Sequence, residues 1–315
     1  MKRLFTFGCS FTNYHWPTWA DIVSQDYDYY ENWGRGGAGN KFIYFSLVEC
    51  HQRNCITTDD TVIIMWSSQA REDKFLNNEW YTPGTVYSSA YTNDFISNFT
   101  DTTGYLLDTV TYIQSSNHLL DSIGCEKYFL SMLPMYISSD WFSTLTQKLN
   151  PDVSTKILKL YAPTLQQIKP SIYETVFKSD WHSKDKKVIP QDTQHGYDIL
   201  YKNYTDNATT NWPTFNNFYN NEMQDVELWV LEELDKKFNL MDARDKVKLL
   251  KRADLHPTPI EHLEYLQCIN FNLSTKAEEF AKHWEELVMR SDSVFWCLGP
   301  NHQSNTWSNK TPERF

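Results

Sequence analysis

Thr61–Trp66 (TVIIMW) is the clearest strand signal in the chain. The run is short, continuous, apolar and rich in β-branched side chains, which is typical of a strand buried on both faces of a parallel sheet. Three further runs resemble it: 3–7 (RLFTF), which ends at Gly8, the aromatic run 27–33, and 127–133 (KYFLSML). Together they predict four strands.

Helical patterns separate these strands. We expect helices over about 17–25, with Pro17 in its first turn, over about 40–55, where Asn40 is a candidate cap, and over 104–122. Residues 79–100 are polar and aromatic and predict a loop excursion. The alternation of strand and helix favours a doubly wound α/β sheet.

The pattern breaks near residue 134, which suggests an organisation in parts. We assign 1–134 and 250–298 to an α/β core, 135–249 to a helical and loop insertion or cap, and 299–315 to a polar tail. The remaining predicted elements are helices near 140–149, 163–178, 222–237, 258–269 and 275–289, a loop over 180–220 and a late strand at 293–298.

Composition excludes several classes of protein. The chain has 315 residues with 41% apolar and 16% aromatic side chains, which excludes disorder. No run approaches the roughly 18 apolar residues of a membrane span. A net charge of −11 without a Lys/Arg stripe argues against binding to a nucleic-acid backbone.

Cysteine spacing and the N-terminus indicate the compartment. The six cysteines include no CxxC pair, which predicts free thiols in a reducing environment. The N-terminal apolar run is far too short for a signal peptide. We therefore expect a cytoplasmic protein.

Glycine is scarce and unevenly placed. Four of only ten glycines lie within 34–39, in the loop 32–40 (NWGRGGAGN) after the second predicted strand. This loop approximates a dinucleotide fingerprint, but its spacing is not G-x-G-x-x-G and it does not follow the first strand. Exposed backbone N–H groups in such a loop suit an oxyanion equally well.

Ser10 follows the first predicted strand and Gly8. A side chain there lies at the carboxyl edge of a parallel sheet, where the ligand sites of α/β proteins form. Gly8 would let the backbone turn tightly before a nucleophile. The competing interpretation is that Ser10 simply caps the following helix.

The segment 254–262 (DLHPTPIEH) holds a candidate base. Asp254 stands two residues before His256, and a carboxylate near a histidine fixes its tautomer. The alternative is a surface D-x-H ahead of a helix. His262 and His256 together are a candidate pair of metal ligands, but no carboxylate or cysteine group is arranged to complete a site, so we assign His262 a structural role.

The chain resembles the SGNH hydrolase superfamily, also called GDSL esterases. The matching blocks are Gly8–Thr12 (GCSFT), Asn32–Gly37 and Asp254–Pro257 (DLHP), and the likeness covers about 1–75 and 250–270. It implies a three-layer α/β/α sandwich around a mainly parallel, flavodoxin-like sheet of about five strands, and an enzyme that needs no cofactor or metal.

The resemblance also implies residue roles. Ser10 would attack an ester carbonyl, His256 would take its proton, and Asp254 would orient the histidine. The oxyanion hole would comprise the Ser10 N–H, the Gly37 N–H and an amide side chain.

Three positions depart from the family pattern. The nucleophile block reads GCSF instead of GDSL, the acid–base block is D-x-H where D-x-x-H is commoner, and Trp66–Arg71 (WSSQAR) stands where G-x-N-D is expected. Gln69 occupies the place of the oxyanion asparagine, and its amide is able to donate through a longer arm. Arg71 or Asn40 is the candidate substitute or support.

The predicted function is hydrolysis of an ester, an O-acyl group such as acetyl on a carbohydrate. The 12 Trp and 19 Tyr largely indicate core packing, although the stretches 80–91 and 212–219 are candidate sugar-stacking surfaces. The alternatives are an O-acyltransferase with the same triad, and a non-enzymatic scaffold that binds carbohydrate or serves in a virus particle. The sequence leaves the substrate and the oligomeric state open.

Overall fold

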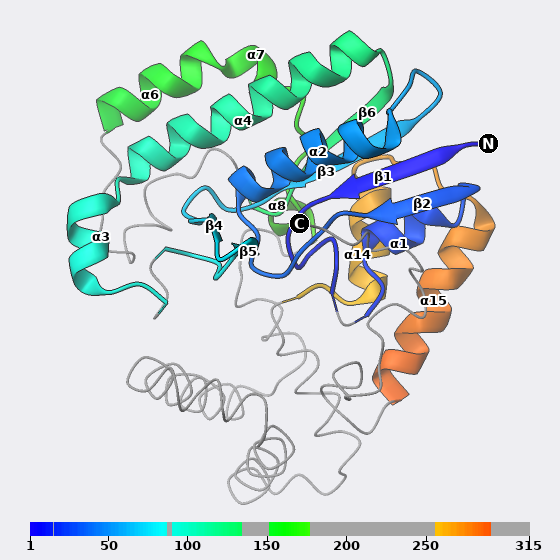
Figure 1. Cartoon of the computed structure of the whole chain (residues 1–315). Coiled ribbons are helices and arrows are strands. Elements are labelled where there is room, and N and C mark those ends of the chain that lie inside the picture. The colour runs from blue at the N-terminus through cyan, green and yellow to red at the C-terminus, as the bar shows by residue number, and fades with distance from the viewer. Residues whose placement is uncertain (15, 87–89, 134–150, 177–255, 291–315) are drawn as a thin grey trace, which may run out of the picture.

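The structure of the chain is a computed structural model, shown in Figure 1. It describes residues 1–14, 16–86, 90–133, 151–176 and 256–290. The statements below concern these residues.

A four-stranded parallel sheet forms the centre of the described structure (Figure 1). Its strands are β1 (Arg3–Phe7), β2 (Tyr29–Asn32), β3 (Thr61–Trp66) and β6 (Glu126–Ser131), in the order β2-β1-β3-β6. The four predicted strands and the α/β class are confirmed. The predicted late strand at 293–298 lies outside the described residues.

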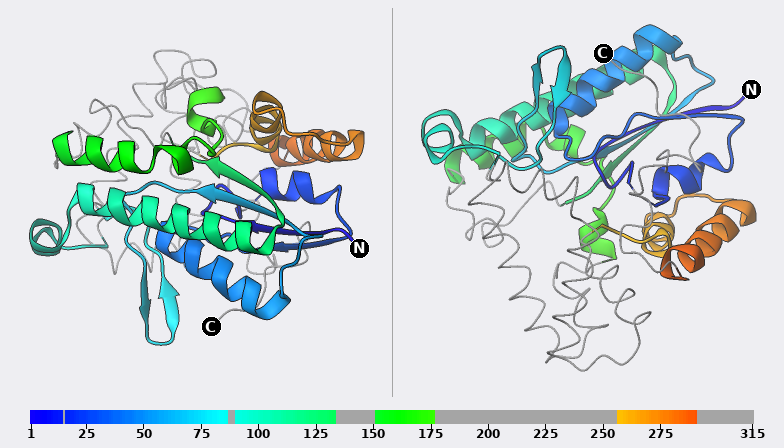
Figure 2. Two further views of the ribbon diagram at one scale, coloured as in Figure 1. Left: turned by 90° about the horizontal axis from the view of Figure 1, so that it is seen from above. Right: turned by 60° about the horizontal axis from the view of Figure 1, so that its bottom comes forward.

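Alternate residues of each strand face opposite sides of the sheet, and each side carries its own core. Phe5, Phe7, Val62 and Ile64 pack with α2 (Asn40–Asn54) and α4 (Thr102–Ile123). Leu4, Ile63 and Met65 pack with α1 (Trp19–Ser24), α14 (Pro259–Cys268) and α15 (Thr275–Arg290). The views in Figure 2 show these two sets of helices on opposite sides of the strands.

The register of the sheet brings three strand ends together at one edge. Phe7, the last residue of β1, pairs with Ile64 of β3, and Thr6 pairs with Asn32, the last residue of β2. All three strands run parallel, so the segments that follow them meet at the carboxyl edge. Those segments are the turn after β1, the glycine loop and the loop 67–73.

The stretch 79–100 is not only a loop. It contains β5 (Glu79–Tyr81), which pairs antiparallel with β4 (Lys74–Leu76), and the short helix α3 (Asn93–Phe99). The prediction missed these elements because three-residue strands and a seven-residue helix are too short to show a hydrophobic period.

Residues 151–176, assigned by sequence to the insertion, lie against the sheet and its helices. They form α6 (Pro151–Leu160), α7 (Ala162–Leu165) and α8 (Ile172–Thr175). Ile157 and Leu165 join the core on the α4 side, and Lys169 N donates to Phe129 O of β6 at 2.8 Å. A single helix over 163–178 was expected, whereas α7 and α8 are separate. The predictions for 140–149, 180–220, 222–237 and 299–315 lie outside the described residues.

Two further features bear on the expectations. Cys9, Cys50, Cys55, Cys125 and Cys268 are free thiols. Among the helices described, none combines the length and the apolar character needed to cross a bilayer.

Candidate active site

Ser10 lies on a turn between β1 and α1, and it caps no helix. The N-cap of α1 is Thr18, whose side chain accepts from Ala20 N and which forms a capping box with Asp21. Gly8 is required because a Cβ there would lie 1.9 Å from Thr12 Oγ1. The glycine therefore makes room for the turn to fold back, and it does so without a left-handed backbone.

His256 reaches Ser10 from the far end of the chain. Its Nε2 lies 2.8 Å from Ser10 Oγ, within the range that joins a nucleophile to its base. His256 stands two residues before Thr258, the N-cap of α14. Neither interpretation as a simple helix cap nor as an isolated surface histidine accounts for this pair. Asp254, the predicted orienting carboxylate, lies outside the described residues.

The glycine loop is tied to the serine turn by three hydrogen bonds. Asn32 Nδ2 donates to Thr12 O at 2.8 Å, and Asn13 Nδ2 donates to Gly34 O at 3.1 Å. Arg35 N donates to Gly8 O at 3.1 Å. These bonds cross between the two loops, so they set the position of the glycine loop relative to Ser10.

The backbone conformation at Gly37 requires a glycine. Its φ is 72°, in the left-handed region, and a Cβ would lie 2.1 Å from Thr82 O. Within the described residues, the backbone N–H groups of Ser10 and Gly37 donate to no acceptor. An oxyanion hole requires backbone N–H donors that are not already bonded within the protein.

Gln69 follows β3 and is 7% exposed. It lines a cavity of about 80 Å³ together with Tyr105, Thr109 and Tyr112 of α4. Its side-chain amide has no hydrogen-bond partner in the part of the chain that the structure describes, and there no hydrogen bond joins it to Ser10 or His256. Within the described residues the amide is therefore uncommitted, and the cavity that it lines borders α4 and does not include Ser10 or His256 in its lining.

Asn40 supports the loop after β3. Its Oδ1 accepts from Ser67 N at 2.8 Å, and its Nδ2 donates to Ser67 O and Thr109 Oγ1, both at 3.1 Å. The expectation that Asn40 caps α2 is wrong, because the N-cap is Gly39. The amide is fully used in holding Ser67.

Arg71 also has a supporting position. Its Nη1 donates to Ala38 O at 2.9 Å, next to Gly37, and its Nη2 lies 3.9 Å from Met132 Sδ. Cys9 Sγ contacts the same sulfur at 3.6 Å. Arg71 therefore stabilises the glycine loop through its hydrogen bond to Ala38.

Asp73 supplies the cap that α2 lacks in its own sequence. Its carboxylate accepts from Gly39 N and Phe42 N, each at 2.9 Å. Burial raises the pKa of Asp73, while these two N–H groups act in the opposite direction. The loop after β3 and the glycine loop are thus joined through the start of α2.

A second buried carboxylate stands behind the serine turn. Asp21 accepts from Thr18 N at 2.8 Å and from Tyr30 Oη at 3.3 Å, and Thr18 Oγ1 donates to Thr12 O at 2.7 Å. Burial raises the pKa of Asp21 to about 7, against the effect of its hydrogen bonds. Its protonation state therefore bears on the turn that carries Ser10.

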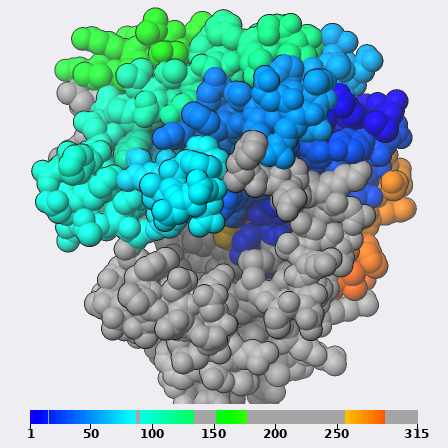
Figure 3. Space-filling model, in the orientation of Figure 1, coloured from blue at the N-terminus to red at the C-terminus, as the bar shows by residue number. Residues whose placement is uncertain are grey.

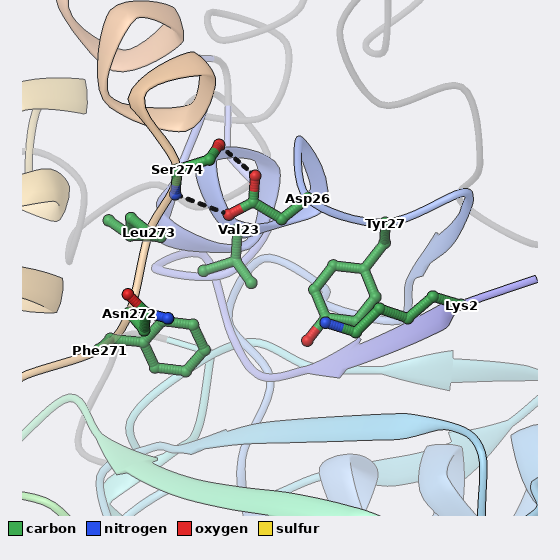
Figure 4. Close-up of a pocket in the computed structure, with 8 residues that line it drawn as sticks. All are labelled: Lys2, Val23, Asp26, Tyr27, Phe271, Asn272, Leu273 and Ser274. Carbon is green, nitrogen blue, oxygen red and sulfur yellow. Dashed lines mark hydrogen bonds between the residues drawn. The ribbon is translucent and has the colours of Figure 1, made fainter.

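A separate concavity lies at the other end of β1 (Figure 4). It has a volume of about 290 Å³ and includes Lys2, Tyr27 and Leu273 in its lining. Asp26 accepts from Ser274 N at 3.0 Å across it. Lys2 precedes β1 and Ser10 follows it, so a five-residue strand, about 17 Å long, separates this concavity from the serine.

Trp80, in the first of the two candidate sugar-stacking stretches, is a packing residue. Trp80 is 8% exposed and its ring contacts Phe42, Phe45 and Phe75, so it belongs to the packing. The stretch 212–219 lies outside the described residues. His262 is buried in α14, and among the described residues no three His, Cys, Asp or Glu side chains form a metal-holding group.

Sequence reasoning missed the residues that hold the histidine. Phe11, Tyr14 and Trp16 all contact His256 or its neighbour Pro257. Their one visible signal is three aromatic side chains within seven residues of the nucleophile. Asp73 gave no signal, since its role depends entirely on tertiary contacts.

Comparisons with known proteins do not assign the chain. No protein-family model matches it, and no curated protein matches it either.

Proposed function

We propose that the chain is a serine ester hydrolase of SGNH type that removes O-acyl groups, such as acetyl, from a carbohydrate. The observation that carries this proposal is the 2.8 Å separation of Ser10 Oγ and His256 Nε2. The N–H groups of Ser10 and Gly37, which donate to no acceptor within the described residues, support it, because an oxyanion hole needs donors of this kind.

In the proposed reaction, Ser10 Oγ attacks the carbonyl carbon of the acyl group while His256 removes the hydroxyl proton of Ser10. The electrons of the carbonyl double bond move to the carbonyl oxygen of the substrate. This oxyanion accepts hydrogen bonds from the Ser10 N–H, the Gly37 N–H and the Gln69 amide. Collapse breaks the bond to the sugar oxygen, which takes the proton from His256. Water then cleaves the acyl–serine ester by the same route and releases the carboxylic acid. Asp254 orients His256.

The finer organisation is part of the proposal. We propose a three-layer α/β/α sandwich with a flavodoxin-like sheet of about five strands, formed by 1–134 and 250–298, with 135–249 as an insertion. The order β2-β1-β3-β6 and helices on both faces of the sheet support it. We expect the protein to act in the cytoplasm, and its expected partner is a small-molecule or carbohydrate ester.

A fluorophosphonate probe tests the proposal. We expect wild-type protein to be labelled, and Ser10→Ala to lose both labelling and p-nitrophenyl acetate hydrolysis, by on the order of 10⁴–10⁶-fold in kcat. His256→Ala should lose hydrolysis to a similar degree. The control is Ser122→Ala, an exposed serine on α4 that should leave both readouts unchanged.

Absence of labelling and hydrolysis across about pH 6–9, a range that extends well above the ordinary pKa of histidine, would overturn the enzyme in favour of a binding scaffold. An added sugar alcohol separates the remaining alternatives. Hydrolysis yields mainly acetate, whereas an acyltransferase yields mainly the acetylated sugar.

A further inference from the structure

Figure 3 shows dark blue atoms of the N-terminal segment on the face that Figure 1 presents. The serine turn belongs to this segment, and the residues that follow Ser10 in it contact His256. The Tyr14 ring stacks on the imidazole, with centroids 3.8 Å apart and planes 14° apart. Phe11 meets the imidazole edge-on at 5.4 Å and 62°.

The backbone beside His256 is held by the same segment. Trp16 Nε1 donates to Pro257 O at 2.8 Å, and the Trp16 side chain is 3% exposed. A buried indole N–H needs an acceptor, so the bond is costly to lose. Tyr14 packs edge-on against Trp16 with centroids 4.7 Å apart, which joins the two contacts into one unit.

His256 requires such support because it lies ahead of α14, outside regular secondary structure. A histidine on a loop samples several rotamers, and only one presents Nε2 to Ser10. A stacked ring on one face and an edge-on ring at its side restrict that rotation. A tyrosine face also favours the imidazolium that forms when the serine gives up its proton.

We propose that Tyr14 and Trp16 are positioning residues that hold His256 against Ser10, so that one short segment carries the nucleophile and places its base. This inference rests on the proposed function for its effect on rate. Its geometric part is independent of activity. Tyr14 and Trp16 touch the histidine and its neighbour, and they act on the reaction only through it.

The first test measures activity. Tyr14→Leu should lower kcat for p-nitrophenyl acetate by about two- to tenfold, as loss of one stacked pair implies, with KM little changed. Tyr14→Phe keeps the ring and should restore the wild-type rate. The matched control is Tyr44→Leu, which removes a tyrosine stacked on Tyr112 at 5.5 Å on the α2–α4 side. Equal rates in Tyr14→Leu and wild type would overturn the inference while leaving the hydrolase in place.

The second test does not depend on catalysis. Diethylpyrocarbonate modification of His256, followed by mass spectrometry, should be faster in Tyr14→Leu and in Trp16→Phe by about two- to tenfold. The exposed His118 is the internal reference and should not change. An unchanged rate at His256 in both folded variants would overturn the inference, even if wild-type protein proved inactive and the proposed function failed.

Discussion

The turn after β1 and the loop after β3 lie at the same edge of the sheet, but they are held in different ways. The turn is tied at its centre, where Thr12 O accepts from both Asn32 and Thr18. The loop is tied at its two ends, through Ser67 to Asn40 and through Asp73 to the start of α2. Gln69, near its middle, has no described hydrogen-bond partner.

This difference distinguishes the Ser10–His256 pair from Gln69, the candidate oxyanion donor. Ser10 and His256 are already in contact, and hydrogen bonds and aromatic packing hold them there. Gln69, the candidate third oxyanion donor, is buried and has no hydrogen-bond partner among the described residues. The loop after β3 is also the place where the sequence departs most from the SGNH pattern, so under the proposed function that departure concerns the oxyanion hole and not the Ser10–His256 pair.

Removing the charge behind the serine turn should have the largest effect. Because the pKa of Asp21 is raised from 3.8 to about 7 in the folded chain, folding takes up a proton between these values. The stability that this group contributes is therefore full below about pH 4 and lost as the pH rises through about 7, a total of about 4 kcal/mol at roughly 1.4 kcal/mol per unit.

Urea unfolding at several pH values measures this dependence. Asp21→Asn keeps an acceptor for Tyr30 and should flatten the pH dependence of unfolding over that window. A variant whose unfolding free energy follows pH as steeply as wild type would show that Asp21 is not the group responsible.

Substitution of Gln69 should have the next largest effect, and it tests the loop after β3. If its amide donates to the oxyanion, Gln69→Ala should lower kcat by about 10²–10³-fold, the cost of one oxyanion donor. Gln69→Glu has a similar size and places a charge there, so it should be at least as damaging. Steady-state hydrolysis of p-nitrophenyl acetate measures both, and a rate unchanged by Gln69→Ala would remove this residue from the oxyanion hole.

Gly37 offers a smaller and more local test of the loop that joins the two regions. Gly37→Ala should destabilise the fold by about 1–3 kcal/mol, because a Cβ meets Thr82 O and the backbone is left-handed. Gly36→Ala is the matched control, since a Cβ there meets nothing within 4 Å. Thermal unfolding compares them, and equal melting temperatures would contradict the assigned backbone role of Gly37.

The sequence predicted the parts of the molecule that depend on local pattern. Four buried strands, α1, α2, α4, α14 and α15 were expected from their periodicity, and the pairing of Ser10 with His256 was expected from the SGNH resemblance. The role of Asn40 was wrong because a carboxylate 33 residues away, Asp73, supplies the helix cap. The contacts of Tyr14 and Trp16 with the segment 256–257 were unpredictable for the same reason: neither side chain reveals its distant partner in the sequence.

The span between Ser10 and His256 has a consequence for how the chain folds. The strand pairings that the structure describes in the parallel sheet lie within residues 3–131, whereas the contact between Ser10 and His256 joins residues 246 positions apart. Closing so long a loop is slow and entropically costly, so this contact forms after the sheet. During synthesis Ser10 emerges from the ribosome long before His256, so the growing chain carries the serine without its histidine partner until residue 256 has been made.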